Sequence, residues 1–157
     1  MQTGFEEIIE NLGKELDIPL QTDNNNSCVI LVEDKISVQI DENESKILLA
    51  TFVAALPPGK FRENVLKIAL KANGIQKSIG VFAFHEKTTN LAMYSYIDKH
   101  DLTATILKDY LLAFVETSIN WQEAIDNGNL SLLDQNIPKV ESSIFRFKPW
   151  RKRLKSI

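Results

Sequence analysis

The chain has 157 residues, of which 44% are hydrophobic and 25% charged, with a net charge of −3 at pH 7. This balance is typical of one globular domain and excludes a disordered chain. The single cysteine, Cys28, excludes an internal disulfide, and no apolar run reaches membrane-spanning length. Since the first residues also lack the layout of a signal peptide, we expect a cytoplasmic protein.

The net charge conceals an asymmetry along the chain. The last twelve positions hold six basic residues and no acidic one: Arg146, Lys148, Arg151, Lys152, Arg153 and Lys155. Residues 1–145 therefore carry a net charge of −9. An acidic body repels nucleic acid and anionic membranes, and it favours partners with basic or polar extended segments.

The first predicted element is an amphipathic helix that ends before Pro19, because proline disfavours helical geometry at the preceding residue. Apolar residues recur at helical spacing at Phe5, Ile8, Ile9, Leu12 and Leu16. A stripe of this kind belongs either to the core or to a docking groove. The pattern leaves both interpretations open.

Three strands are predicted next. Residues 28–32 form a continuous apolar run bounded by turn residues, which indicates a strand covered on both faces. Residues 36–40 alternate between apolar and polar, as in a strand with one face in water. Residues 47–56 form the third strand, and a Pro-Pro-Gly sequence separates it from the next predicted element.

A second helix is predicted over residues 60–73, and Asn73-Gly74 favours a helix end there. Its apolar residues cover more than the width that one core contact needs, since Leu66 and Leu70 extend a face already formed by Phe61, Val65, Ile68, Ala69 and Ala72. We therefore expect this helix to contact both its own sheet and a second subunit.

Two short strands and a long helix complete the domain. In the strand at 78–85, Gly80 leaves room for another backbone beside Phe82. The strand at 91–97 places Tyr94 and Tyr96 on one face, and a helix then runs to about residue 125. The predicted fold class is α+β, an antiparallel sheet with three helices in the order α-β-β-β-α-β-β-α. Residues 1–128 form this domain, and residues 129–157 form a C-terminal extension with the basic tail.

The sequence offers no recognisable catalytic chemistry. His85 and His100 lack the spacing of a metal site, and Cys28 lies in an apolar run without a basic neighbour. Neither a glycine-rich phosphate loop nor a nucleophile–base pair is present. We expect a protein that is not an enzyme and that uses no cofactor, metal or small-molecule substrate.

This order of elements resembles the class I type III secretion chaperones, which are small acidic cytosolic proteins. The resemblance covers roughly residues 3–128. The features that carry it are Leu66-x-x-x-Leu70-x-Ala72-Asn73, Gly80 near a strand start, Leu91-x-Met93, and a final helix with Leu107, Phe114 and Trp121.

The resemblance implies a chaperone that keeps a secreted effector competent for export by binding its N-terminal segment in extended form. It implies an effector-binding surface from the first helix and early strands: Phe5, Ile8, Ile9, Leu12, Val29 and Leu31. It also implies a dimer, either of identical chains or with a related chaperone, through Phe61, Leu66, Leu70, Gly80 and Phe82.

The basic tail departs from the family pattern, which usually ends near the final helix. We expect it to lie on an acidic surface of its own dimer or of a partner, through Phe147, Trp150, Arg151, Lys152 and Arg153. The alternative is a dimeric structural or regulatory subunit whose tail contacts nucleic acid or an anionic membrane. The acidic body argues against that alternative.

Overall fold

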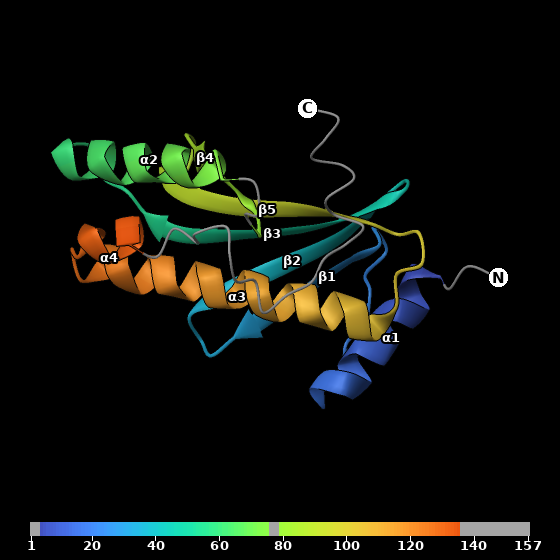
Figure 1. The fold of residues 1–157 in the computed structure, drawn as a ribbon. Helices are drawn as coiled ribbons and strands as arrows, with labels where there is room; N and C mark the ends of the chain where they lie inside the picture. The colour runs from blue at the N-terminus through green and yellow to red at the C-terminus, as the bar shows by residue number, and fades with distance from the viewer. Residues whose placement is uncertain (1–3, 76–78, 136–157) are drawn as a thin grey trace.

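The computed structural model describes residues 4–75 and 79–135 (Figure 1). Its elements in chain order are α1 (Phe5–Leu16), β1 (Ser27–Val32), β2 (Ile36–Asn43), β3 (Lys46–Ala55), α2 (Lys60–Asn73), β4 (Val81–His85), β5 (Asn90–Asp98), α3 (Ala104–Asp126) and α4 (Leu130–Gln135). The α+β class and the predicted order are confirmed. The prediction of three helices was one short, because the six residues of α4 are too few to show helical periodicity.

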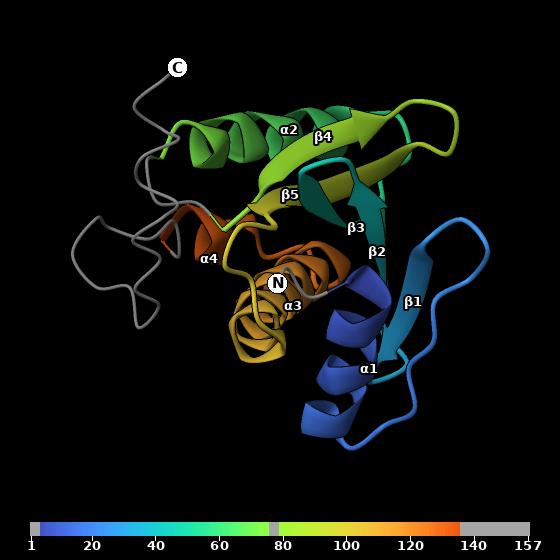
Figure 2. The same cartoon turned by 90° about the vertical axis from the view of Figure 1, so that its right-hand side faces the viewer.

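The five strands form one antiparallel sheet in the order β1-β2-β3-β5-β4. The first three strands follow one another as a meander. β5 pairs with β3, so β4 is placed at the far edge of the sheet. The two edge strands of the sheet are therefore β1 and β4 (Figure 2).

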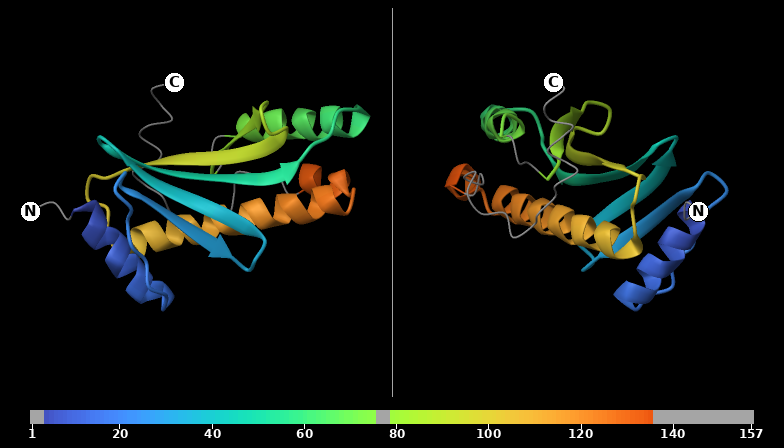
Figure 3. Two further views of the ribbon diagram at one scale, coloured as in Figure 1. Left: turned by 180° about the vertical axis from the view of Figure 1, so that it is seen from behind. Right: turned by 45° about the vertical axis from the view of Figure 1, so that its right-hand side comes forward.

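Helices α1 and α3 cover one face of the sheet (Figures 2 and 3). The core lies between this helical layer and the inward side chains of the strands: Leu107 and Phe114 of α3 are fully buried, as are Val38 and Leu49. Thr103 begins α3 as its N-cap, since its side chain accepts a hydrogen bond from the Ile106 N–H.

The short helix α4 packs against two other helices of the chain. Leu133 is almost fully buried, and α4 contacts both α2 and α3. An ion pair joins Lys71 of α2 to Asp134 at 3.6 Å, although an exposed pair of this kind contributes only about 0–1 kcal/mol. Among the described helices, none is long and apolar enough to cross a membrane.

Candidate protein-binding surfaces

The apolar stripe of α1 lies in the core. Its four predicted effector-binding side chains, Phe5, Ile8, Ile9 and Leu12, are at most 5% exposed. The structure corrects the prediction that they line an effector-binding groove, because α1 packs this stripe inward, against α3 and the core. The polar side of α1, including Glu6, Glu7 and Glu10, faces solvent.

Strand β1 presents the other two predicted effector-binding residues. Cys28 and Ile30 point into the core, whereas Val29 and Leu31 are 62% and 60% exposed. The prediction of a strand covered on both faces was wrong, because the helices lie on only one face of the sheet. The structure therefore separates the six predicted residues onto opposite faces.

The face of the sheet opposite α1 and α3, here called the open face, is largely apolar on β1, β3, β4 and β5, whereas β2 contributes the polar side chains Ser37, Gln39 and Asp41. The register aligns Val29 with Gln39, Ala50, Tyr94 and Val81 in one row across the sheet. Further exposed or half-buried members of this face are Leu31, Leu48, Phe52, Ala92 and Tyr96. Apolar surface spread over neighbouring strands is unusual for a monomer and marks an interaction site.

A groove of about 510 Å³ crosses this open face. Residues with small or short side chains, among them Ser37, Ala50 and Ala92, are flanked by Phe52, Tyr94 and Tyr96. The Tyr94 and Tyr96 rings are 5.9 Å apart in an edge-on arrangement. Small residues between aromatic ones leave room for the side chains of an extended peptide.

Charged groups stand at one end of the open face. Asp41 accepts hydrogen bonds from the Gln39 amide, at 2.9 Å, and from the Ser27 hydroxyl. The strand register places Asp98 opposite Lys46 in the same region, and the Lys46 ammonium lies 5.8 Å from the centre of the Tyr96 ring. Two carboxylates, of Asp41 and Asp98, and the Lys46 ammonium therefore lie at one end of the face that holds the apolar groove.

A second apolar surface lies on α2. Leu70 is 71% exposed, Phe61 is 38% exposed, and Leu66 is partly buried. Val65 and Ile68, on the inner side of the same helix, are buried. The apolar side chains of this helix that exceed the needs of one core contact therefore lie at the surface.

The other two predicted dimer residues lie inside the domain. A Cβ on Gly80 would come within 2.8 Å of the Tyr94 carbonyl oxygen, so the backbone that Gly80 admits is that of β5 in the same chain. The Phe82 ring packs on Trp121 of α3 at 4.1 Å between ring centres and is 6% exposed. The contacts of these two residues are thus with β5 and α3, and neither residue forms part of the α2 surface.

Asn73 joins α2 to the edge of β4. Its side-chain amide donates to the Phe82 carbonyl oxygen at 2.9 Å and accepts from the Phe82 N–H at 2.8 Å. Both backbone groups of an edge residue are thereby satisfied by a side chain in place of a further strand. This contact fixes the end of α2 against the sheet.

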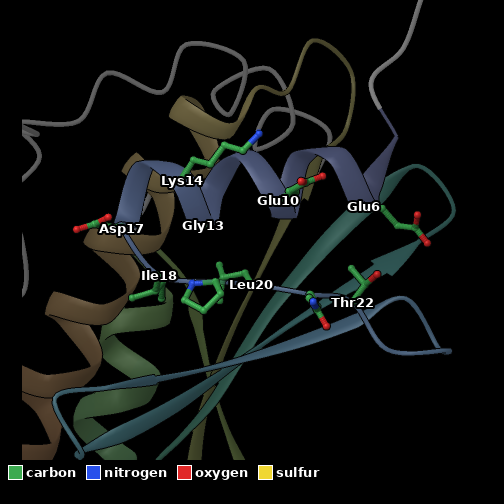
Figure 4. Close-up of a pocket in the computed structure, with 10 residues that line it drawn as sticks. Glu6, Glu10, Gly13, Lys14, Asp17, Ile18, Leu20 and Thr22 are labelled. Carbon is green, nitrogen blue, oxygen red and sulfur yellow. The ribbon is translucent and has the colours of Figure 1, made fainter.

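A polar groove of about 760 Å³ lies between α1 and the segment after it (Figure 4). Glu6, Glu10 and Asp17 line it together with Lys14. A Cβ on Gly13 would come within 2.6 Å of the Ile18 carbonyl oxygen, so glycine lets this segment close against the helix. The groove is acidic, in contrast to the apolar groove of the open face.

The described residues contain no group of histidine, cysteine and carboxylate side chains able to hold a metal ion. Cys28 is buried, and its burial, with a smaller contribution from the Asp23 carboxylate, raises the pKa of the thiol. A raised pKa disfavours the reactive thiolate.

The open-face groove was not predicted from the sequence, although the alternation of β5 placed Tyr94 and Tyr96 on one face. The missing information was the strand order, which brings Phe52 and Val29 onto the same surface as these tyrosines. The predicted tail residues Phe147, Trp150, Arg151, Lys152 and Arg153 lie outside the described residues.

The sequence profile of the Tir chaperone protein (CesT) family matches residues 7–122. A comparison with curated proteins found no similar sequence. Among solved structures, the HopA1–SchA chaperone–effector complex is 18% identical with a TM-score of 0.62, over 74% of this chain and 91% of that chain.

Two further solved structures are similar. The Yersinia pestis type III secretion chaperone SycH, in complex with a stable fragment of YscM2, is 16% identical with a TM-score of 0.63, over 75% of this chain and 99% of that chain. The ExsC–ExsE complex is 17% identical with a TM-score of 0.61, over 76% and 92%. At these identities the likeness establishes a shared fold.

Proposed function

Since this chain belongs to the Tir chaperone protein (CesT) family, we propose that it is a cytoplasmic chaperone that binds the N-terminal segment of a type III secreted effector in extended form. We further propose that the protein acts without catalysis and without a cofactor or metal. The similar structures include a chaperone–effector complex and a type III secretion chaperone bound to a protein fragment, which supports this function.

The observation that carries the proposal is the apolar open face beside the edge strand β1. An extended segment that pairs with β1 continues the sheet through backbone hydrogen bonds. Its alternate side chains then lie next to Val29 and Leu31, both more than half exposed. Backbone pairing supplies affinity with little dependence on sequence, and the groove selects apolar side chains.

Dimerisation through α2 is the second part of the proposal. Phe61, Leu66 and Leu70 form its apolar centre, and the partner is a second copy or a related chaperone. Full burial of one leucine contributes about 1.5–3 kcal/mol. The domain limits, residues 1–128 for the chaperone domain and 129–157 for the extension, are part of the proposal, with α4 packed on the domain as its first segment.

Affinity purification of the tagged full chain from its native cytoplasm tests the function. We expect a secreted protein to copurify and to be lost when its own N-terminal segment is deleted. Leu31→Asp should abolish this copurification, whereas Leu112→Asp, at a half-exposed position on α3, should not. Equal capture by both variants would contradict the proposed site.

A further inference from the structure

The open-face groove has a candidate occupant in the chain itself. The described residues end at Gln135, and 22 residues follow. We propose that the groove binds residues 144–155 of this chain, the basic and aromatic segment near its C-terminus. This inference goes beyond the proposed function. It depends on that function only in implying that the C-terminal segment and an effector would compete for the same surface.

The sequence of the segment matches an apolar groove. Phe145 and Phe147 alternate with Arg146 and Lys148, so in an extended conformation the two rings lie on one side and the two charges on the other. Trp150 follows. The groove offers Ala50 and Ala92 between Phe52, Tyr94 and Tyr96, which leaves space for aromatic rings.

Charge complementarity sets the orientation. All charged residues of the segment are basic. The carboxylates of Asp41 and Asp98 lie at the Lys46 end of the open face. Among the described residues, the hydrogen-bond donors to the Asp41 carboxylate are uncharged. With the rings in the groove, Arg151–Arg153 lies toward these carboxylates.

The length of the chain allows the contact. Phe147 is 12 residues beyond Gln135. An extended chain of that length spans about 40 Å, whereas a ten-residue strand such as β3 is about 33 Å long. Tethering provides an effective concentration on the order of millimolar, so weak contacts suffice for occupancy.

Hydrogen–deuterium exchange of the full chain without any client tests the docking. We expect amides of residues 144–155 to exchange about tenfold more slowly than in a free peptide of the same sequence, as for a segment docked about 90% of the time. High salt should reduce this protection. Ala50→Arg, which fills the groove and adds positive charge, should abolish it, while Leu112→Arg, which adds the same charge on α3, should not.

A second experiment keeps the inference testable where Ala50→Arg does not fold. In the full chain, Phe147→Ser with Trp150→Ser should expose the groove, so that nitration of Tyr94 and Tyr96 becomes several times faster while the buried Tyr110 is unaffected. Unchanged nitration would overturn the inference.

Free exchange of the tail in every condition, or protection that survives in folded Ala50→Arg protein, would also overturn it. So would protection that arises only on addition of a DNA duplex or of phosphatidylserine vesicles, which would assign the tail to nucleic acid or membrane. Because these measurements contain no effector, their result is independent of whether the chain acts as an effector chaperone.

Discussion

The two edges of the sheet differ in how their backbones are covered. At β4, the Asn73 amide satisfies the N–H and C=O of Phe82, and α2 packs against the strand. At β1, the strand pairing of the described residues is with β2 alone, and Val29 and Leu31 stand exposed beside it. Unprotected edges attract further strands, and proteins usually cover edges that have no partner. The covered edge at β4 has a structural role in this chain, whereas the open edge at β1 supports the binding role that we propose for it.

The largest expected effect distinguishes the buried stripe of α1 from the exposed side of β1. Leu12→Ala removes a fully buried side chain and should lower the free energy of unfolding by about 2–5 kcal/mol. Leu31→Ala, at a 60% exposed position, should change it by less than about 0.5 kcal/mol. Urea denaturation measures both, and similar losses would show that β1 is covered in solution.

At the β4 edge, Asn73→Ala leaves two backbone groups of Phe82 without their partner. We expect a loss of about 1–3 kcal/mol in the free energy of unfolding. Asn73→Asp retains the acceptor for the Phe82 N–H and loses the donor to its carbonyl, so it should cost less. If the alanine variant is as stable as the original chain, the edge is not held by this side chain.

The α2 surface beside the β4 edge should contribute to assembly and not to folding. Leu70→Ala should weaken dimerisation by about 1 kcal/mol per subunit, because Phe61 and Leu66 remain. Sedimentation over a concentration series measures the shift, and Ile106→Ala on α3 is the matched control, since Ile106 is also exposed. If Ile106→Ala weakened the dimer and Leu70→Ala did not, the interface would lie on α3 and not on α2.

The smallest effect concerns the buried side of β1. The pKa of the Cys28 thiol is raised by burial, so the folded state favours the neutral thiol. Its contribution to stability is fully present below the thiol pKa of the unfolded chain and is lost as the pH rises through the raised pKa of the folded chain. Denaturation of Cys28→Ala should therefore depend less on pH on the alkaline side, and an identical pH dependence would contradict burial of the thiol.

The sequence predicted the type and order of the elements well, because each helix and strand has a local period. It did not predict which apolar residues face the core and which lie at the surface. The α1 stripe is buried because α3 lies beside it, and Val29 and Leu31 are exposed although they belong to a continuous apolar run. The position of β5 between β3 and β4 decides which side chains form the open face, and no local pattern encodes it.

The residues that the family resemblance implied for the dimer interface do not all lie at the surface. Leu70 and Phe61 lie at the surface as expected, but Gly80 and Phe82 pack inside their own domain. A glycine in a strand indicates the close approach of another backbone, and it does not distinguish the same chain from a second subunit.

The most direct test is hydrogen exchange of the full chain with and without its copurified effector. We expect binding to slow exchange of the amides in residues 27–32 of β1, while those in residues 81–85 of β4 are unchanged. Added protection at β4 with none at β1 would contradict the assignment of the two edges and the proposed mode of binding.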